Sequence, residues 1–211
     1  MNDLNILKIS KSRPDNKIID QAARILDKGG IVVAPTETRY GLLGRIDNPD
    51  VLKKLYGLKG RQGRQPSAVF VRDQEEIFEF GCENKLSRTL AQQFLPGPLT
   101  LVLKDKSGYP EPIVVGGKIG IRFSSSLVIA KILNKVKFNI TATSANISGG
   151  KELETIEEIA AVFRSNVDLY LDGGHLDSLP STVVDCSCDT YKILRSGAFT
   201  REEIKKKIVR L

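Results

Sequence analysis

The feature that most constrains the fold is a regular alternation of short apolar runs with amphipathic helical segments. Segment 14–30 carries apolar residues at helical spacing and ends in the pair Gly29-Gly30. Residues 31–35, IVVAP, form a short apolar run typical of a buried strand. Segment 48–60 begins with Asn-Pro, a common helix start. This alternation predicts an α/β protein.

The same alternation continues to the C-terminus. We expect further strands at 67–71, 99–104, 118–123, 138–145, 169–173, 181–187 and 191–197, and further helices at 86–95, 126–136, 155–166 and 200–211. The last two helices begin with capping boxes, Thr155 with Glu158 and Thr200 with Glu203. The neighbouring strands near the C-terminus favour antiparallel pairing. We therefore predict one domain, residues 1–211, built on a mixed sheet.

Composition indicates a soluble globular protein. Hydrophobic residues make up 41% of the 211 residues and charged residues 27%. No apolar run approaches the roughly 20 residues that a membrane helix needs. The first residues, MNDLNILKIS, lack the basic start and the long apolar stretch of a signal peptide. We predict a cytoplasmic protein.

Cysteine and histidine usage argues against two kinds of site. The cysteines are Cys82, Cys186 and Cys188, and His175 is the only histidine. A structural zinc site usually needs four Cys or His ligands, and no serine motif accompanies the histidine. The spacing of Cys186 and Cys188 fits a strand with both side chains on one face. We predict free thiols and no metal site.

A net charge of +7 and a pI near 9.3 indicate an anionic partner, which could be nucleic acid, a nucleotide or another polyphosphate. An inert basic surface is the alternative. The stretch LKGRQGRQPSAVFV concentrates Lys59, Arg61 and Arg64. In an extended segment, Lys59 and Arg61 would point the same way. A solvated run of charges would look the same in sequence.

Two polar stretches follow predicted strands. PTETRYGL, residues 35–42, offers Thr36, Glu37 and Thr38 at a strand end, where open α/β sheets bind ligands, and Gly41 suits a tight turn. An ordinary helix cap and turn is the alternative for this stretch.

The second stretch is TATSANISGG, residues 141–150, where Ser144 and Asn146 suit a phosphate or ribose contact. Alone it is an ordinary polar turn. Neither G-x-x-x-x-G-K-[ST] nor G-x-G-x-x-G occurs, so a bound nucleotide would rely on side-chain cations. Together the three stretches predict an anion or nucleotide pocket.

Seven motifs occur in the order seen in one known family: PTETRYGL, KGRQGRQP, LPGPLTLVL, IGIR, SANISG, STVVD and ILRSGA. The chain resembles the YrdC-like threonylcarbamoyl-AMP synthases from its first helix to Ala198. The resemblance implies a twisted mixed sheet with flanking helices around a large concave basic cavity. It also implies a reaction of L-threonine, bicarbonate and ATP that yields threonylcarbamoyl-AMP and pyrophosphate. The product serves threonylcarbamoyladenosine modification of tRNA, with separate modification proteins as partners.

The resemblance also assigns roles to individual residues. The residues expected to bind ATP are Lys59, Arg61, Gln65, Ser144, Asn146 and Arg195. The residues expected to bind threonine are Thr38, Arg122 and Ser181. Lys59 and Arg61, together with Mg²⁺ on the nucleotide, are the expected catalytic groups, and the stretch 60–65 is a candidate for closing over the site. No general base is assigned, and His175 lies outside the matched residues.

Several positions depart from the family pattern, and other functions stay open. Arg39 stands where a small apolar residue is usual. Gln62 stands where the family usually has proline, Gln65 where it has asparagine or lysine, and Ser67 where it has leucine. Phe70 stands where some relatives have a histidine on the threonine side of the site. A relative with a different substrate is therefore one alternative. A module that binds double-stranded RNA or tRNA without synthase activity is another. A carbamoyl-transfer enzyme using carbamoyl phosphate or an acyl-adenylate is a third.

Overall fold

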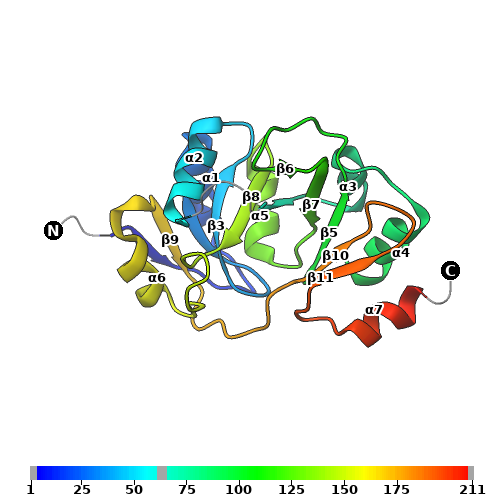
Figure 1. Cartoon of the computed structure of the whole chain (residues 1–211). Helices are drawn as coiled ribbons and strands as arrows, with labels where there is room; N and C mark the ends of the chain where they lie inside the picture. The colour runs from blue at the N-terminus through cyan, green and yellow to red at the C-terminus, as the bar shows by residue number, and fades with distance from the viewer. Residues whose placement is uncertain (1–3, 61–65, 209–211) are drawn as a thin grey trace.

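The computed structural model describes residues 4–60 and 66–208. Within these ranges eleven strands form one sheet, with helices around it (Figure 1). The strands are β1 Ile6–Lys8, β2 Val32–Pro35, β3 Tyr40–Arg45, β4 Ala68–Phe70, β5 Leu99–Lys104, β6 Val114–Val115, β7 Lys118–Arg122, β8 Ile140–Ser144, β9 Leu169–Asp172, β10 Thr182–Asp185 and β11 Lys192–Arg195. The helices are α1 Asn16–Asp27, α2 Pro49–Leu58, α3 Gln74–Phe80, α4 Lys85–Phe94, α5 Leu127–Lys135, α6 Ile156–Phe163 and α7 Arg201–Ile208, with a 3-10 turn at Arg164–Asn166.

The sheet is mixed, as predicted. Its order is β1-β9-β2-β3-β8-β4-β7-β5-β10-β11, with β6 paired to β7 outside this path. The pairs β1/β9, β2/β9, β4/β7 and β5/β10 are parallel, and the remaining pairs are antiparallel. The predicted antiparallel pairing of the last two strands, β10 and β11, is confirmed. The mixed α/β fold with a twisted sheet and flanking helices is therefore confirmed.

Local sequence signals explain where several helices begin. Thr155 accepts a hydrogen bond from the backbone of Glu158, whose side chain returns to the cap backbone, so the predicted box is present. Thr200 and Glu203 form the same reciprocal pair at α7. Asn48 caps α2, with proline in the first turn. Each cap satisfies backbone N–H groups that the helix itself leaves unpaired.

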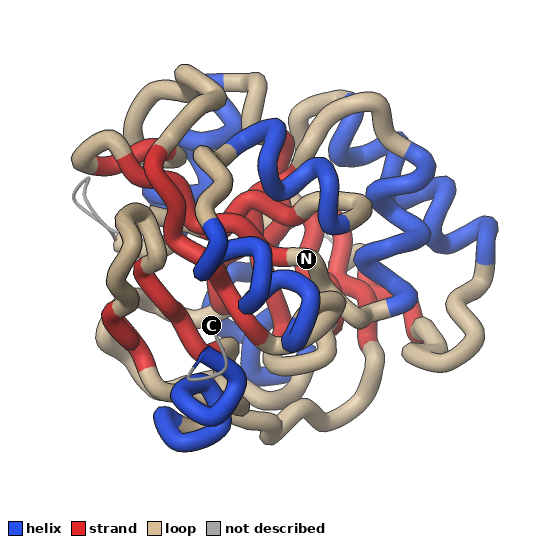
Figure 2. Tube along the Cα trace, turned by 90° about the vertical axis from the view of Figure 1, so that its right-hand side faces the viewer, coloured by secondary structure: helices blue, strands red, loops and turns tan. Residues whose placement is uncertain are grey.

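Helices cover the two halves of the sheet differently. Around β2, Ala34 packs with α1 and α5 on one face, while Val33 packs with α2 and α6 on the other. Figure 2 shows helices flanking the strands. On β5, Leu101 packs in a core with α3, α4 and α7, whereas its neighbours Thr100 and Val102 line a cavity. Since alternate residues of a strand point to opposite faces, this half of the sheet keeps one face open.

Several elements were not predicted. β1 and β6 have only three and two residues, and α3 follows its cap, Asp73, without a long apolar pattern. The prediction that Gly41 forms a tight turn is wrong, because it lies inside β3 opposite Ser144. Gly44, also in β3, lies under α2, where an added Cβ would come 2.9 Å from Val51. These glycines allow close packing within a strand.

Two smaller expectations are also wrong. Lys59 does not lie in an extended segment, because it caps α2 with right-handed helical dihedral angles. Cys186 and Cys188 do not share a face, since β10 ends at Asp185 and Cys186 is buried while Cys188 is exposed. Both are free thiols, as predicted, together with Cys82. In the described ranges, no helix has the length and apolar character needed to cross a lipid bilayer.

Candidate active site

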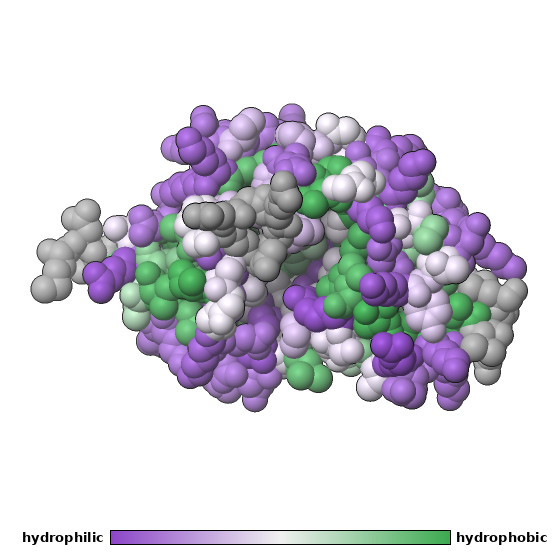
Figure 3. All heavy atoms as spheres, in the orientation of Figure 1, coloured by the Kyte–Doolittle hydropathy of each residue, from purple (hydrophilic) through white to green (hydrophobic). Residues whose placement is uncertain are grey.

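A cavity of about 360 Å³ lies on the open face of the sheet. Its floor carries small residues on adjacent strands: Gly41 on β3, Ala142 on β8, Ala68 on β4 and Gly120 on β7. An added Cβ on Gly120 would lie 3.7 Å from Thr100, so the absence of a side chain leaves space above the strand. Figure 3 shows this face hollowed between the part with β9 and α6 and the part with β10 and β11.

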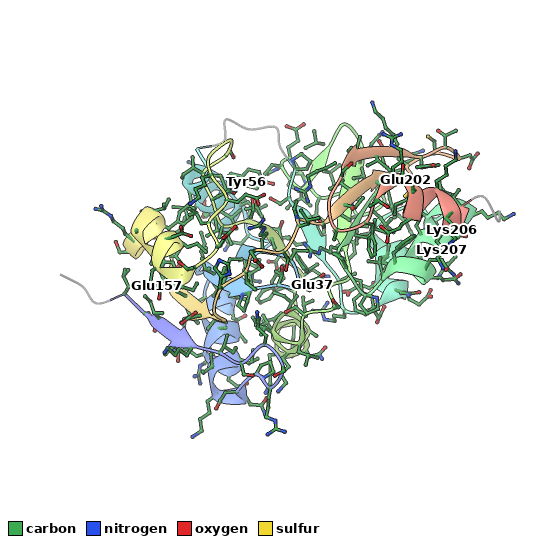
Figure 4. The ribbon with its side chains drawn as sticks, turned by 90° about the horizontal axis from the view of Figure 1, so that it is seen from below. Glu37, Tyr56, Glu157, Glu202, Lys206 and Lys207 are labelled. Atoms are coloured by element: carbon green, nitrogen blue, oxygen red, sulfur yellow. The ribbon has the colours of Figure 1, made fainter. Side chains whose placement is uncertain are left out.

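Arg122, at the end of β7, forms one wall of this cavity and is only 8% exposed. Its Nη2 donates to Thr38 Oγ1 at 2.8 Å and lies 3.0 Å from Glu37 Oε1. Ser124 donates to the other oxygen of Glu37. The guanidinium carbon of Arg122 lies 5.4 Å from the ring centre of Phe70, which also lines the cavity. Figure 4 shows Glu37 near the centre of the molecule.

Thr36 builds the loop that carries Thr38. Its Oγ1 accepts hydrogen bonds from the backbone N–H groups of Thr38, at 3.1 Å, and Arg39, at 3.2 Å. It also donates to the carbonyl of Arg39 at 2.7 Å. A threonine side chain that bonds its own backbone in this way fixes a short turn. The hydroxyl of Thr38 is therefore held against Arg122.

Ser181 and Arg195 form a second group on the cavity wall. Arg195 Nη2 donates to Ser181 Oγ at 2.8 Å and to the Ser181 carbonyl at 2.9 Å. Ser181 also shares a hydrogen bond of 3.0 Å with Thr100 on β5. Burial lowers the pKa of Arg195, the charge of Arg122 lowers it further, and Glu152 acts in the opposite direction. The two arginines are thus electrostatically coupled across one cavity.

Lys59 and the turn after β8 form a third group. Lys59 is 1% exposed, and its Nζ donates to the Ser144 carbonyl at 2.5 Å, Ser144 Oγ at 3.2 Å and Asn146 Oδ1 at 2.8 Å. The Lys59 carbonyl accepts from the backbone of Ser148 at 3.0 Å. Ser144 lines the cavity, whereas Lys59 and Asn146 lie behind it. Lys59 therefore holds the turn from the inside.

The structure brings most of the predicted site residues together. Five of them line one cavity, namely Thr38, Arg122, Ser144, Ser181 and Arg195. Lys59 and Asn146 join this group through Ser144. Arg61 and Gln65, and the proposed closing stretch 60–65 beyond Gly60, lie outside the described residues. The roles assigned to all of these residues stay predictions.

Other residues in or beside the cavity wall were not predicted as site residues. Glu37 was recognised only as one carboxylate at a strand end, and its partner Arg122 is 85 positions away in sequence. Lys118 on β7 pairs with Asp185 on β10 at 2.7 Å. Because residues 118, 120 and 122 alternate along one strand, the shared face of Lys118 and Arg122 could have been read from the strand period alone.

Two residues that depart from the family pattern, Arg39 and Ser67, make defined contacts in the structure. Arg39 pairs with Glu152 at 2.7 Å and with Glu154 at 3.1 Å, so its charge is balanced at the rim of the cavity. Ser67 shares a hydrogen bond of 2.7 Å with the Tyr56 hydroxyl. Gln62 lies outside the described residues. The cavity lining thus holds four cationic residues, Arg39, Lys118, Arg122 and Arg195, against the carboxylates of Glu152 and Asp185.

The described residues offer no ready metal site, since no three His, Cys, Asp or Glu side chains in these ranges gather to hold an ion. His175 lies 3.0 Å from Glu154, in a pair that does not line the cavity. The arrangement instead suits anionic groups: a buried guanidinium at one end, and a hydroxyl and a second guanidinium at the other. The expected basic character of the whole cavity stays a prediction.

Comparisons with known proteins agree with this geometry. Residues 24–197 match the Sua5/YciO/YrdC family model, which is described as "Telomere recombination". A Methanocaldococcus jannaschii protein named "Putative threonylcarbamoyl-AMP synthase" is 34% identical over 191 residues, covering 90% of each chain. The Bacillus subtilis threonylcarbamoyl-AMP synthase is 33% identical over 191 residues, covering 89% of this chain and 55% of that protein.

Among solved structures, Pyrococcus abyssi Sua5 complexed with L-threonine superposes with a TM-score of 0.90 at 30% identity. That match covers 96% of this chain and 60% of the Sua5 chain. The chain thus spans little more than half the length of the bacterial relative and of Sua5, and nearly all of the M. jannaschii relative. A family model covering most of the chain, and these relatives, confirm the expected membership: the chain belongs to the Sua5/YciO/YrdC family.

Proposed function

We propose that this protein is a threonylcarbamoyl-AMP synthase, joining L-threonine, bicarbonate and ATP. The observation that carries the proposal is the buried Arg122 on the wall of a cavity that also holds Ser144 and Arg195. The printed names of the relatives, and the L-threonine bound by P. abyssi Sua5, support it. A carbamoyl-transfer enzyme and a relative with another substrate have no such support here.

At the Arg122 end, we propose that the cavity binds threonine. Thr38, Arg122 and Ser181 supply two hydroxyls and a guanidinium to the lining, with Ser181 lying next to Arg195. No hydrogen bond joins Arg122 Nη1 to any residue in the described ranges, so this group can serve a carboxylate, whereas Nε is also unpaired there but is buried. A charge-assisted contact of this kind fixes the amino acid at the guanidinium.

At the other end, we propose that Ser144 and Arg195 contact ATP, with Asn146 and Lys59 supporting Ser144 from behind. Arg61 and Gln65 remain predicted ATP contacts outside the described residues. The described residues provide no cluster of acidic ligands for Mg²⁺. The ion would therefore be bound by the nucleotide phosphates and by water, where it neutralises charge on the phosphates.

In the proposed reaction, the threonine amine adds to carbon dioxide derived from bicarbonate and loses a proton, giving a carbamate. A carbamate oxygen then attacks the α-phosphorus of ATP, the α–β P–O bond breaks and pyrophosphate leaves. Reactions of this type need alignment and charge stabilisation more than covalent help from the protein. Arg122 would hold the amino acid in line, and Arg195 would stabilise charge at the phosphate.

The proposal extends to a role in the cell. The product would serve threonylcarbamoyladenosine formation on tRNA in the cytoplasm, together with separate modification proteins. The alternative, a module that only binds double-stranded RNA or tRNA, is not favoured by the relatives, several of which carry the synthase name.

The test is an assay of the purified protein with L-threonine, bicarbonate, ATP and Mg²⁺. We expect threonylcarbamoyl-AMP, identified by mass spectrometry, and an equal amount of pyrophosphate. With ¹³C-bicarbonate the adenylate should gain one mass unit, because its carbamoyl carbon comes from bicarbonate. Pyrophosphate release that does not depend on threonine, or no labelled adenylate at all, would refute the proposed function.

A further inference from the structure

Glu37 is a part-buried carboxylate beside the cavity, and the proposed function leaves its role unexplained. Its side chain is 13% exposed, and it is not among the residues that line the cavity. Oε1 lies 3.0 Å from Arg122 Nη2, and Oε2 accepts a hydrogen bond from Ser124. Ser124 in turn accepts from the backbone of Ser126 at 3.1 Å, at the start of α5. The carboxylate is thus held next to Arg122 without lining the cavity itself.

The burial of Arg122 requires an acceptor group or an opposite charge next to its guanidinium. A guanidinium with a side chain only 9% exposed is strongly disfavoured unless an opposite charge or hydrogen-bond acceptors lie next to it. Among the described residues, Glu37 is the carboxylate that forms an ion pair with Arg122. Thr38 Oγ1 is the acceptor at hydrogen-bond distance, 2.8 Å from Nη2. Both partners contact the same terminal nitrogen of the guanidinium.

This arrangement leaves Nη1 of the guanidinium for a ligand. Nε and Nη1 make no hydrogen bond to the described residues, and Nε is fully buried. Nη2 is hydrogen-bonded to Thr38 and ion-paired with Glu37, whose Oε1 makes no hydrogen bond in the described ranges, and the two contacts together restrict how the guanidinium can turn. Such pre-organisation of one binding group by a neighbouring group lowers the ordering cost when the ligand binds.

We propose that Glu37 is a positioning residue that orients Arg122 for the carboxylate of the amino-acid substrate. The inference rests on the proposed function for the nature of that substrate. Glu37 itself contacts neither substrate. It acts through Arg122, so its loss should weaken amino-acid binding while leaving ATP binding and the chemical step nearly unchanged.

The first measurement is the NMR signal of the Arg122 Nε–H group in ¹⁵N-labelled protein, assigned by its disappearance in Arg122→Lys. In the native protein this buried N–H should exchange slowly with water. We expect Glu37→Ala to remove or broaden the signal and Glu37→Gln, which keeps an oxygen facing Arg122, to preserve it. An unchanged, protected signal in Glu37→Ala would overturn the inference, whether or not the protein is a synthase.

The second measurement is steady-state kinetics. Glu37→Ala should raise KM for threonine about tenfold, with kcat and KM for ATP within about threefold of the native values. Glu37→Gln should restore KM for threonine to within about threefold. An equal rise in both KM values, or none, would contradict a positioning role.

A matched control is Glu76→Ala. Glu76 is also 13% exposed and pairs with an arginine, Arg72, at 2.6 Å, but Arg72 does not line the cavity, whereas Arg122 does. It should lower stability without changing KM for threonine or the Arg122 signal. If Glu37→Ala fails to fold, Glu37→Asp is used instead, because it shortens the reach of the carboxylate. It should weaken the Arg122 Nε–H signal and raise KM for threonine, each by less than Glu37→Ala would. A native protein that makes no adenylate would refute the proposed function, while the NMR result still decides the inference.

Discussion

The two ends of the cavity place their positive charge in different ways. At the Arg122 end, the cation is part of the cavity wall and is balanced from behind by Glu37. At the Ser144 end, the cation of Lys59 is turned inward, and a serine hydroxyl faces the cavity in its place. A cation near a ligand site can therefore either bind the ligand or build the turn that does. The four predictions below separate these two roles.

The largest effect is expected for Arg122→Lys. Lysine keeps the charge beside Glu37 but loses the planar guanidinium that contacts the carboxylate. We expect kcat/KM for threonine to fall about 100-fold, equivalent to about 2.7 kcal/mol, with KM for ATP nearly unchanged. Steady-state kinetics measures both values. Arg72→Lys, at the pair with Glu76, is the control and should leave both within about twofold.

The second prediction concerns Lys59→Met. Lys59 is 1% exposed, and removing its ammonium takes one hydrogen bond from the Ser144 carbonyl and one from the Asn146 side chain. Each of these acceptors keeps one partner within the turn itself. We expect the free energy of unfolding to fall by about 2 kcal/mol, and KM for ATP to rise about 30-fold. Denaturant unfolding and kinetics measure the two. A rise in KM without loss of stability would instead make Lys59 a direct phosphate ligand.

Lys54→Met is the matched control for that variant. Lys54 lies on the same helix, α2, and its pair with Asp168 is about two-fifths exposed on both sides. An exposed pair contributes little, so we expect less than about 1 kcal/mol of change and an unaltered KM for ATP.

The third prediction tests the floor between the two ends. In Gly120→Ala, the new Cβ would keep ordinary contact distances, 3.7 Å from Thr100 and 3.8 Å from Ala68. Gly120→Val adds bulk toward both proposed ligands, so we expect kcat/KM to fall about tenfold for threonine and for ATP. The free energy of unfolding should stay within about 1 kcal/mol of the native value. The alanine variant should stay within about twofold. Loss at one end alone would show that the two ligands do not share this floor.

The smallest effect is expected for Glu152→Gln. Glu152 balances Arg39 at the cavity rim, but it is 47% exposed. An exposed ion pair is worth about 1 kcal/mol or less, so KM for either substrate should change by no more than about threefold. A larger change would mean that Arg39, which departs from the family pattern, takes part in binding.

The sequence allowed most of the fold to be predicted because helices and strands here follow their hydrophobic periods closely. β3 escaped prediction because Gly41 and Gly44 resemble turn residues, and their strand role depends on packing against Ala142, Val51 and Leu55. The burial of Lys59 could not be predicted from a run of cations. Its acceptors lie 85 and 87 residues away and meet it only in the folded sheet.

In the site, too, some residues could be predicted from the sequence and others could not. The resemblance assigned Thr38, Arg122 and Ser181 to threonine and Ser144 and Arg195 to ATP, and all five of these residues line the cavity. Glu37 was noted as a carboxylate, but its function depends on a contact across 85 residues. Sequence patterns indicate which residues are polar near a strand end. Only the folded structure shows which polar residue faces the ligand and which supports it.

The central claim is that one cavity holds the amino acid and the nucleotide side by side. A crystal structure with L-threonine and a non-hydrolysable ATP analogue tests it most directly. We expect the threonine carboxylate within hydrogen-bond distance of Arg122 and the α-phosphate next to Ser144 and Arg195, with the amine facing that phosphate. Threonine bound away from Arg122, or the two ligands in separate hollows, would contradict the account.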